Sequence, residues 1–142
     1  MKSIGFIGVG TMGLPMALNL IKKGHSLSFF DPYAINETIF ALTDVGAKQD
    51  NNIADLCDGK DFVISMLPIG KNVKDVALGE DGIINQENTD LIFIDMSTIL
   101  PADTIASASP STTAEIAKPI LVVFTFLKDL DAFSSPLIQS ST

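Results

Sequence analysis

The sequence has little of what several protein classes require. Its 142 residues include one cysteine, Cys57, so neither an intramolecular disulfide nor a cysteine zinc cluster can form, and we expect a reducing compartment, the cytoplasm. The longest apolar stretch, residues 120–127, is far shorter than the roughly 20 residues that span a bilayer. The glycine-rich start has no arginine and fits neither a secretory signal nor a transit peptide. We therefore expect no membrane partner.

Positive charge is also scarce. Nine basic side chains stand against seventeen acidic ones, which gives a formal net charge of -8 and a pI near 4.3. Such a chain repels phosphate backbones and anionic lipid surfaces, so we expect no nucleic-acid partner. With 46% hydrophobic residues, the chain is long enough to bury an ordinary core as one domain.

Short apolar runs alternate with helix-like segments along the first hundred residues. Buried runs rich in β-branched and aromatic residues predict strands, and apolar residues at helical spacing predict helices between them. This alternation is typical of βαβ units with right-handed crossovers, so the predicted fold class is α/β with a doubly wound parallel sheet. The predicted strands cover residues 2–8, 27–30, 61–66 and 91–95, and the predicted helices cover about 14–23, 35–45, 52–58, 71–78 and 101–108.

A glycine-rich loop, Gly8-x-Gly10-x-x-Gly13, separates the first predicted strand from the first helix. In this context Gly8 permits a tight turn, Gly10 lets the backbone approach a pyrophosphate, and Gly13 allows close packing of helix on strand. The helix N-terminus then offers free N–H groups and a partial positive charge to the phosphates. The loop predicts a dinucleotide cofactor. A methyltransferase with a similar glycine loop is the alternative from another class.

Asp31 ends the second predicted strand. A carboxylate at this place accepts hydrogen bonds from the adenosine ribose and repels a 2'-phosphate, which favours NAD over NADP. The alternative interpretation is that Asp31 only caps the turn before Pro32.

Residues 5–20 read GFIGVGTMGLPMALNL, and this segment resembles, nearly residue for residue, the opening signature of the β-hydroxyacid dehydrogenases. That family includes 3-hydroxyisobutyrate dehydrogenase and shares the NAD(P)-binding domain of 6-phosphogluconate dehydrogenase. Residues 65–68 (SMLP) and 95–99 (DMSTI) are similar to two later segments of the family. The resemblance covers residues 1 to about 106 and implies a Rossmann-type NAD(P)-binding domain.

The same resemblance implies which residues form the site. It places Ser97 beside the substrate, where its hydroxyl would touch a carboxylate. Without the resemblance, Leu67 and Pro68 would only terminate a strand, and Ser97 would cap a helix. The implied cofactor-binding residues are Gly8, Gly10, Thr11, Met12, Gly13, Asp31, Leu67, Pro68, Asn72 and Thr98.

The family's second, all-helical domain, which supplies a catalytic lysine, has no counterpart in the sequence. Lys118 and Lys128 follow the fifth predicted strand but lack the context of that lysine and are typical of solvated surface. Residues 107–142 form a divergent tail rich in serine and threonine around one apolar, strand-like piece. Two interpretations stand: the unselected end of a truncated or frameshifted product, or a diverged tail that adds one strand.

The expected function is that of the NAD-binding domain of a 3-hydroxyisobutyrate dehydrogenase-like oxidoreductase. The complete enzyme would transfer a hydride between a β-hydroxy acid and the nicotinamide, whereas this chain, without a catalytic or metal-binding residue, would be inactive alone. The alternative is a non-catalytic dinucleotide-binding module or a partner subunit. Surface that the family buries under its helical domain would be bare here, so we also expect self-association.

Overall fold

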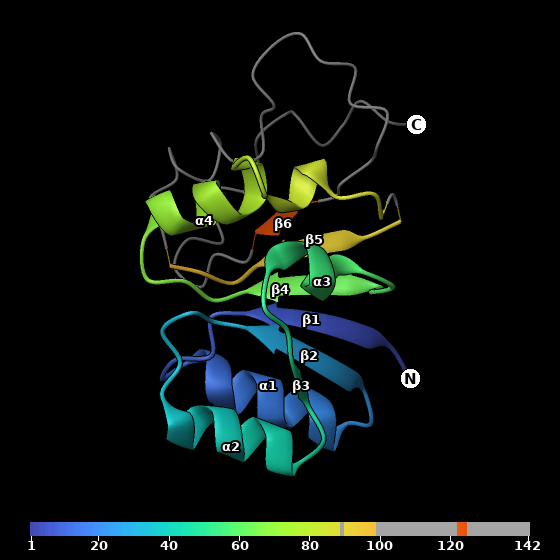
Figure 1. The fold of residues 1–142 in the computed structure, drawn as a ribbon, viewed down its shortest axis with the longest axis vertical. Coiled ribbons are helices and arrows are strands. Elements are labelled where there is room, and N and C mark those ends of the chain that lie inside the picture. The colour runs from blue at the N-terminus through green and yellow to red at the C-terminus, as the bar shows by residue number, and fades with distance from the viewer. Residues whose placement is uncertain (89, 99–121, 125–142) are drawn as a thin grey trace, which may run out of the picture.

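The computed structural model describes residues 1–88, 90–98 and 122–124. Within them, parallel strands form one six-stranded sheet in the order β3-β2-β1-β4-β5-β6 (Figure 1). The predicted Rossmann-type, doubly wound α/β fold is confirmed. The strands are β1 (Ser3–Ile7), β2 (Ser26–Phe30), β3 (Lys48–Gln49), β4 (Phe62–Ser65), β5 (Ile92–Asp95) and β6 (Val122–Phe124), and the helices are α1 (Gly13–Lys22), α2 (Asn36–Asp44), α3 (Ile53–Cys57), α4 (Gly70–Leu78) and the 3₁₀ helix η1 (Ile83–Asn85).

Helices cover both faces of the sheet (Figure 1). Helices α1 and α2 pack on the face that carries Phe6 and Phe29, whereas α3 and α4 pack on the face that carries Ile7, Val63 and Phe93. All five side chains are buried. Because the central strands bury side chains on both faces, they appear in the sequence as continuous apolar runs and not as alternating ones.

Local signals explain most of the element boundaries. The Asn52 side chain accepts a hydrogen bond from the Asp55 amide and so caps the start of α3. Gly24 follows α1 with a φ of 87°, a conformation that favours glycine at the end of a helix. The sequence did not predict β3 or η1. The predicted helix at 101–108 lies outside the described residues, as does most of the predicted tail, within which the structure describes β6.

The strand order creates one edge where a ligand can bind. From β1 the chain adds β2 and β3 on one side, and it then crosses over to add β4, β5 and β6 on the other. In open parallel sheets, ligands bind beyond the carboxyl ends of the strands at such a reversal of order. Here that position lies between β1 and β4. No helix in the described part of the chain is long and apolar enough to cross a membrane.

Candidate functional site

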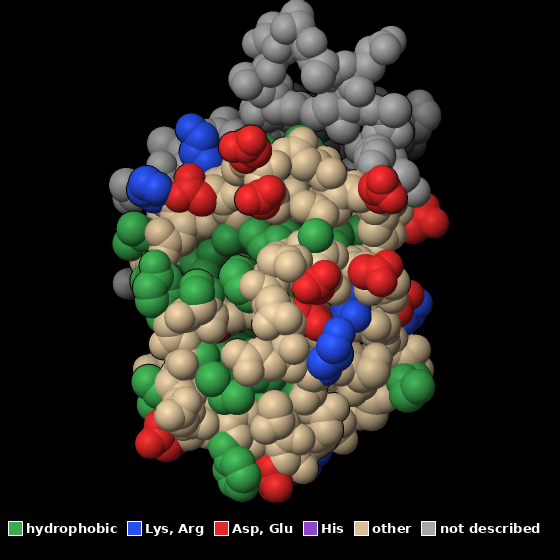
Figure 2. All heavy atoms as spheres, in the orientation of Figure 1, with side chains coloured by type: hydrophobic (Ala, Val, Ile, Leu, Met, Phe, Trp, Pro, Cys, Tyr) green, Lys and Arg blue, Asp and Glu red, His purple; other side chains and the backbone are tan. Residues whose placement is uncertain are grey.

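A cleft of about 550 Å³ opens at the carboxyl ends of β1, β2 and β4. In Figure 2, hydrophobic side chains gather in a hollow on the side where these strands end. A largely apolar cleft of this size is typical of a small-molecule or cofactor site. Its lining residues are Ile7, Gly8, Gly10, Thr11, Met12, Phe30, Asp31, Pro32, Tyr33, Met66, Leu67, Pro68, Asn72, Asp75 and Val76.

Most of the predicted cofactor-binding residues line this cleft, and two do not. Gly13 is buried under the loop at the start of α1, and Thr98 is exposed outside the lining. The residues that line the cleft come from the last residues of β1 and β2, from the loops after β1, β2 and β4, and from α4. The topology therefore brings together residues as far apart in the sequence as Ile7 and Val76. Their contacts with a cofactor stay predictions.

The three glycines of the loop after β1 have different surroundings. Gly8 has a φ of 86°, and a Cβ atom there would overlap the carbonyl oxygen of Met66. A Cβ atom on Gly13 would overlap the carbonyl oxygen of Gly8, so α1 approaches β1 more closely than a side chain would allow. At Gly10, by contrast, a Cβ atom would meet nothing within 4 Å, and the backbone faces the open cleft. At Gly10 the loop thus presents only backbone to the cleft, whereas Thr11 and Met12 of the same loop also line it.

Helix α1 begins directly behind this loop. Its first residue is Gly13, and no side chain caps its N-terminus. In its first turn the Leu14 amide donates to the Gly10 carbonyl oxygen at 2.9 Å. The N–H groups at the start of a helix otherwise lack an intrahelical partner, and they carry a partial positive charge. An acidic protein thereby offers a local site for an anion, and the bare loop at Gly10 leads to it. This arrangement fits the pyrophosphate of a dinucleotide.

Asp31 connects the end of β2 to the glycine loop. Its Oδ2 accepts a hydrogen bond from the Val9 amide at 2.9 Å, and its Oδ1 accepts one from the Tyr33 amide, also at 2.9 Å. The second bond is the turn cap that the sequence offered as the alternative interpretation. The first bond fixes the loop against β2. Asp31 also lines the cleft, and a carboxylate has acceptor positions beyond those that these two amides use.

The opposite side of the cleft is built by the loop after β4. There the Leu67 amide donates to the Ser97 hydroxyl oxygen at 2.8 Å. Ser97 in turn donates to Oδ1 of Asp95 at 2.6 Å, and the Ser65 hydroxyl donates to the same oxygen at 2.6 Å. Ser65 and Asp95 are buried and lie opposite each other in the register of β4 and β5. The resemblance predicts that Ser97 touches the substrate. In the structure its hydroxyl is hydrogen-bonded to two partners inside the protein, Leu67 and Asp95.

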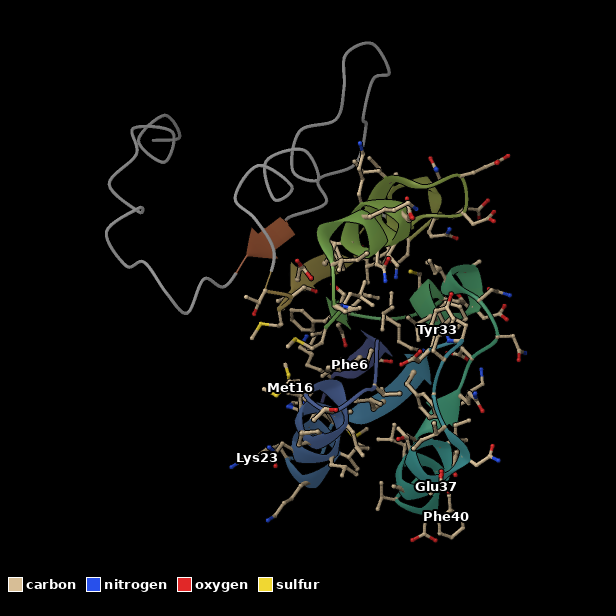
Figure 3. The ribbon with its side chains drawn as sticks, turned by 90° about the vertical axis from the view of Figure 1, so that its left-hand side faces the viewer. Phe6, Met16, Lys23, Tyr33, Glu37 and Phe40 are labelled. Carbon is tan, nitrogen blue, oxygen red and sulfur yellow. The ribbon has the colours of Figure 1, made fainter. Side chains whose placement is uncertain are left out.

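Several lining residues were not predicted, although some carried a signal. Tyr33 lies two residues after Asp31 on the loop after β2, on the side of the molecule that faces the viewer in Figure 3. The residue is 88% exposed. Asp75 and Val76 come three and four residues after Asn72 on α4, so helical spacing places all three on one face. Strand-end position and helical spacing would therefore have found these residues. The packing of Ile7, Phe30 and Met66 against the cleft carried no such local signal.

The two carboxylates that line the cleft differ in their partners. Asp31 accepts backbone amides, as described above, whereas Oδ2 of Asp75 is 2.6 Å from the Lys71 ammonium. The hydrogen bond to Asp75 and its negative charge raise the pKa of Lys71 above its ordinary value. The charge of Asp75 is thus balanced within α4, and no His, Cys, Asp or Glu cluster able to hold a metal occurs in residues 1–88 and 90–98.

Comparison with known proteins gives this fold and site a family. The family described as the NAD binding domain of 6-phosphogluconate dehydrogenase matches residues 3–118. The chain belongs to that family. The recognition from the opening segment is confirmed, and so is a nicotinamide dinucleotide as the class of cofactor that the domain binds.

Individual relatives of this NAD-binding domain are oxidoreductases. The chain is 45% identical to the 3-sulfolactaldehyde reductase of Escherichia coli over 73% of its own length and 34% of that enzyme. It is 40% identical to the 3-hydroxyisobutyrate dehydrogenase of Pseudomonas aeruginosa over 71% of its length and 33% of that enzyme. The structure of Mycobacterium tuberculosis 3-hydroxyisobutyrate dehydrogenase with L-serine matches with a TM-score of 0.66 and 31% identity, over 75% of this chain and 35% of that one. The chain therefore spans about a third of the length of the relatives it matches.

Proposed function

We propose that this NAD-binding domain serves a dehydrogenase of small β-hydroxy acids, and that the chain binds the cofactor through the cleft described above. The observation that carries the proposal is the loop at Gly10, which is bare of side chains, faces the cleft and leads to the uncapped N-terminus of α1. The family of the domain and the names of its relatives, a 3-sulfolactaldehyde reductase and a 3-hydroxyisobutyrate dehydrogenase, support the same class of reaction.

In this proposal each wall of the cleft takes one part of the dinucleotide. The glycine loop, with Thr11 and Met12, holds the pyrophosphate, and Asp31 receives the adenosine ribose. Leu67 and Pro68 press on the cofactor from the β4 side, Asn72 lies nearby on α4, and Thr98 approaches the nicotinamide end. The bound nicotinamide supplies hydride transfer, and the protein supplies position and electrostatics.

We further propose that NAD is preferred to NADP. Asp31 is a carboxylate that lines the cleft at the end of β2, where a 2'-phosphate would lie in NADP. Like charges brought together in a partly dry site cost several kcal/mol, so Asp31 disfavours the phosphate more than any neutral residue would. The residues on the loop after Asp31, Pro32 and Tyr33, offer no positive charge in compensation.

We further propose that the chain binds cofactor without catalysing turnover. Hydride transfer from a hydroxyl needs a general acid or base within hydrogen-bond reach of that hydroxyl. No lysine or histidine lines the cleft among the residues that the structure describes. A second domain or chain would then supply the proton-transfer group. If the protein is instead a dinucleotide-binding module with no catalytic partner, adding the helical half of a relative will not restore turnover.

Titration calorimetry with NAD, NADP and S-adenosylmethionine tests the proposal. We expect saturable binding of NAD, weaker binding of NADP and none of S-adenosylmethionine. A sample shown to be folded by circular dichroism that takes up no dinucleotide at millimolar concentration contradicts the proposed function. Preference for S-adenosylmethionine would support the methyltransferase alternative. Turnover of 3-hydroxyisobutyrate or L-serine by the isolated chain would contradict the proposed lack of a catalytic base.

Self-association is part of the same proposal. Met12 and Ile69, which lie on the loops after β1 and β4, are 59% and 53% exposed. Hydrophobic side chains gathered beside a cleft commonly mark a surface that another domain or chain covers. Sedimentation velocity should show a weight-average mass that rises with concentration, and a monomer at all concentrations would contradict the expectation.

A further inference from the structure

Asp95 is a buried acid for which the proposed function has no use. It is the last residue of β5, is 1% exposed and stands opposite Ser65 in the register of β4 and β5. It lines no part of the cleft, so it does not touch a cofactor there. Burying a carboxylate is costly unless it is hydrogen-bonded, which makes its partners informative.

The partners of Asp95 form a chain that ends at the cleft. Oδ1 of Asp95 accepts the Ser65 hydroxyl at 2.6 Å, the Ser97 hydroxyl at 2.6 Å and the Ser97 amide at 3.2 Å. The Ser97 oxygen then accepts the Leu67 amide at 2.8 Å. Leu67 is one of the residues that form the wall of the cleft on the β4 side. One carboxylate oxygen thus links the ends of β4 and β5 to that wall.

We propose that Asp95 is a positioning residue, which acts through Ser97 to hold the backbone of Leu67 and so sets the shape of the cleft on the β4 side. The inference rests on the proposed function only in that a bound cofactor would meet this wall. The two O–H···O distances of 2.6 Å lie at the short end of the usual range for such hydrogen bonds. The loop after β4 is therefore held in place before any ligand arrives.

The chain of hydrogen bonds also changes the role expected for Ser97. A serine hydroxyl has one hydrogen to donate, and Ser97 gives it to Asp95. Of its two acceptor positions, one is taken by the Leu67 amide. A substrate carboxylate offers no hydrogen for the acceptor position that is left. In this arrangement Ser97 supports the wall of the cleft and is not the donor to a substrate carboxylate.

Amide hydrogen exchange followed by NMR tests the support directly, without any ligand. Ser97→Ala should speed the exchange of the Leu67 amide by about tenfold, because that amide loses its acceptor. The neighbouring Met66 amide donates to the carbonyl oxygen of Ile7 at 2.9 Å and is the internal reference, which should not change. Asp95→Asn, which keeps the shape of the side chain, should move the Leu67 rate in the same direction. Ser97→Thr, which keeps the hydroxyl, should restore slow exchange.

The matched control is Ser28→Ala. Ser28 is also a buried serine, on β2, away from this chain of hydrogen bonds. The Ser28→Ala variant should leave the ratio of the Leu67 and Met66 amide exchange rates unchanged. Equal acceleration at Leu67 and Met66 in Ser97→Ala would show a general loss of stability and would overturn the proposal, as would no acceleration at Leu67.

Binding measurements separate this inference from the proposed function. Ser97→Ala should weaken NAD binding by about threefold or more. Unchanged NAD affinity in a variant whose Leu67 amide exchanges faster would overturn the shaping of the β4 wall. If the unchanged protein does not bind NAD, the proposed function fails and the exchange ratio still decides the role of Asp95.

Discussion

The Asp31 carboxylate holds the Val9 amide at 2.9 Å, and this bond ties the loop after β1 to the end of β2. The same side chain accepts the Tyr33 amide through its other oxygen. A carboxylate has about four acceptor positions, so two remain after both amides are bound. Capping the turn and receiving a ribose are therefore compatible tasks for Asp31, although the sequence presented them as alternatives.

Replacing Asp31 with asparagine should change the choice of cofactor. Asp31→Asn removes the negative charge, so the ratio of NADP affinity to NAD affinity should rise by about tenfold, measured by calorimetry. The asparagine oxygen can still accept one of the two amides, which limits damage to the loop. Asp44→Asn, at the exposed end of α2, is the charge-matched control and should leave the ratio unchanged. An unchanged ratio in Asp31→Asn would remove Asp31 from the ribose site.

Two alanine substitutions in the glycine loop should affect different properties, one the stability of the fold and the other the binding of NAD. Gly13→Ala places a methyl group against the carbonyl oxygen of Gly8 and should destabilise the fold by about 1–3 kcal/mol in urea unfolding. Gly10→Ala meets nothing within 4 Å, so the free energy of unfolding should stay within about 1 kcal/mol of the unchanged protein. Its methyl group should instead weaken NAD binding. If Gly10→Ala binds NAD as tightly as the unchanged protein, the pyrophosphate does not contact the backbone at Gly10.

The sequence was sufficient for those parts of the fold that depend on local patterns. Phe62, Val63 and Ile64 form an apolar run in which Val63 is buried and the other two are half-buried, and β4 is found where this run predicts it. Strand β3 was missed because Lys48 and Gln49 are polar and exposed at the sheet edge, and only their pairing with β2 makes them a strand. Helix η1 has no local signal, because Gly79 and Gly82 directly before it favour a break in the chain over a helix.

The site could be predicted to the extent that its residues lie in one segment. The glycine loop and Asp31 carry their own signal, and the structure brings both to the cleft. The hydrogen bonds of Asp95 with Ser65, and of Ser97 with Leu67, each join residues thirty positions apart. They depend on the register between β4 and β5, which no local pattern encodes. That is why Asp95 received no role from the sequence.

Cys57 should be unreactive in the folded protein. Burial among the side chains between α3 and the sheet raises the pKa of its thiol from 9.0 to about 11, so very little thiolate exists at neutral pH. Ellman's reagent at pH 8 should label the native protein far more slowly than the protein in 6 M urea. Labelling at the same rate in both would show that the cysteine is not buried.

The raised pKa of Cys57 also has a consequence for stability at high pH. Between pH 9 and about 11 the folded protein keeps a thiol proton that the unfolded chain has released, so the free energy of unfolding should fall as pH rises through this range. Cys57→Ala should lessen this fall, because it removes the group that titrates. An identical pH dependence in both proteins between pH 9 and 11 would contradict the assignment.

Asp61 should contribute stability that is lost in acid. Its Oδ2 accepts the Ser3 amide at 2.7 Å and its Oδ1 lies 3.3 Å from the Lys2 ammonium, which fastens the start of β1 to β4. The Ser3 hydrogen bond, and then Lys2, hold the pKa of Asp61 below its ordinary 3.8. Because the folded pKa is the lower one, the contribution is present above pH 3.8 and disappears as pH falls through the folded pKa. Urea midpoints of Asp61→Asn should therefore lie below those of the unchanged protein at pH 6 and approach them near pH 3. Asp44→Asn should show no such convergence, and a difference for Asp61→Asn that is constant from pH 6 to pH 3 would mean that its charge adds nothing.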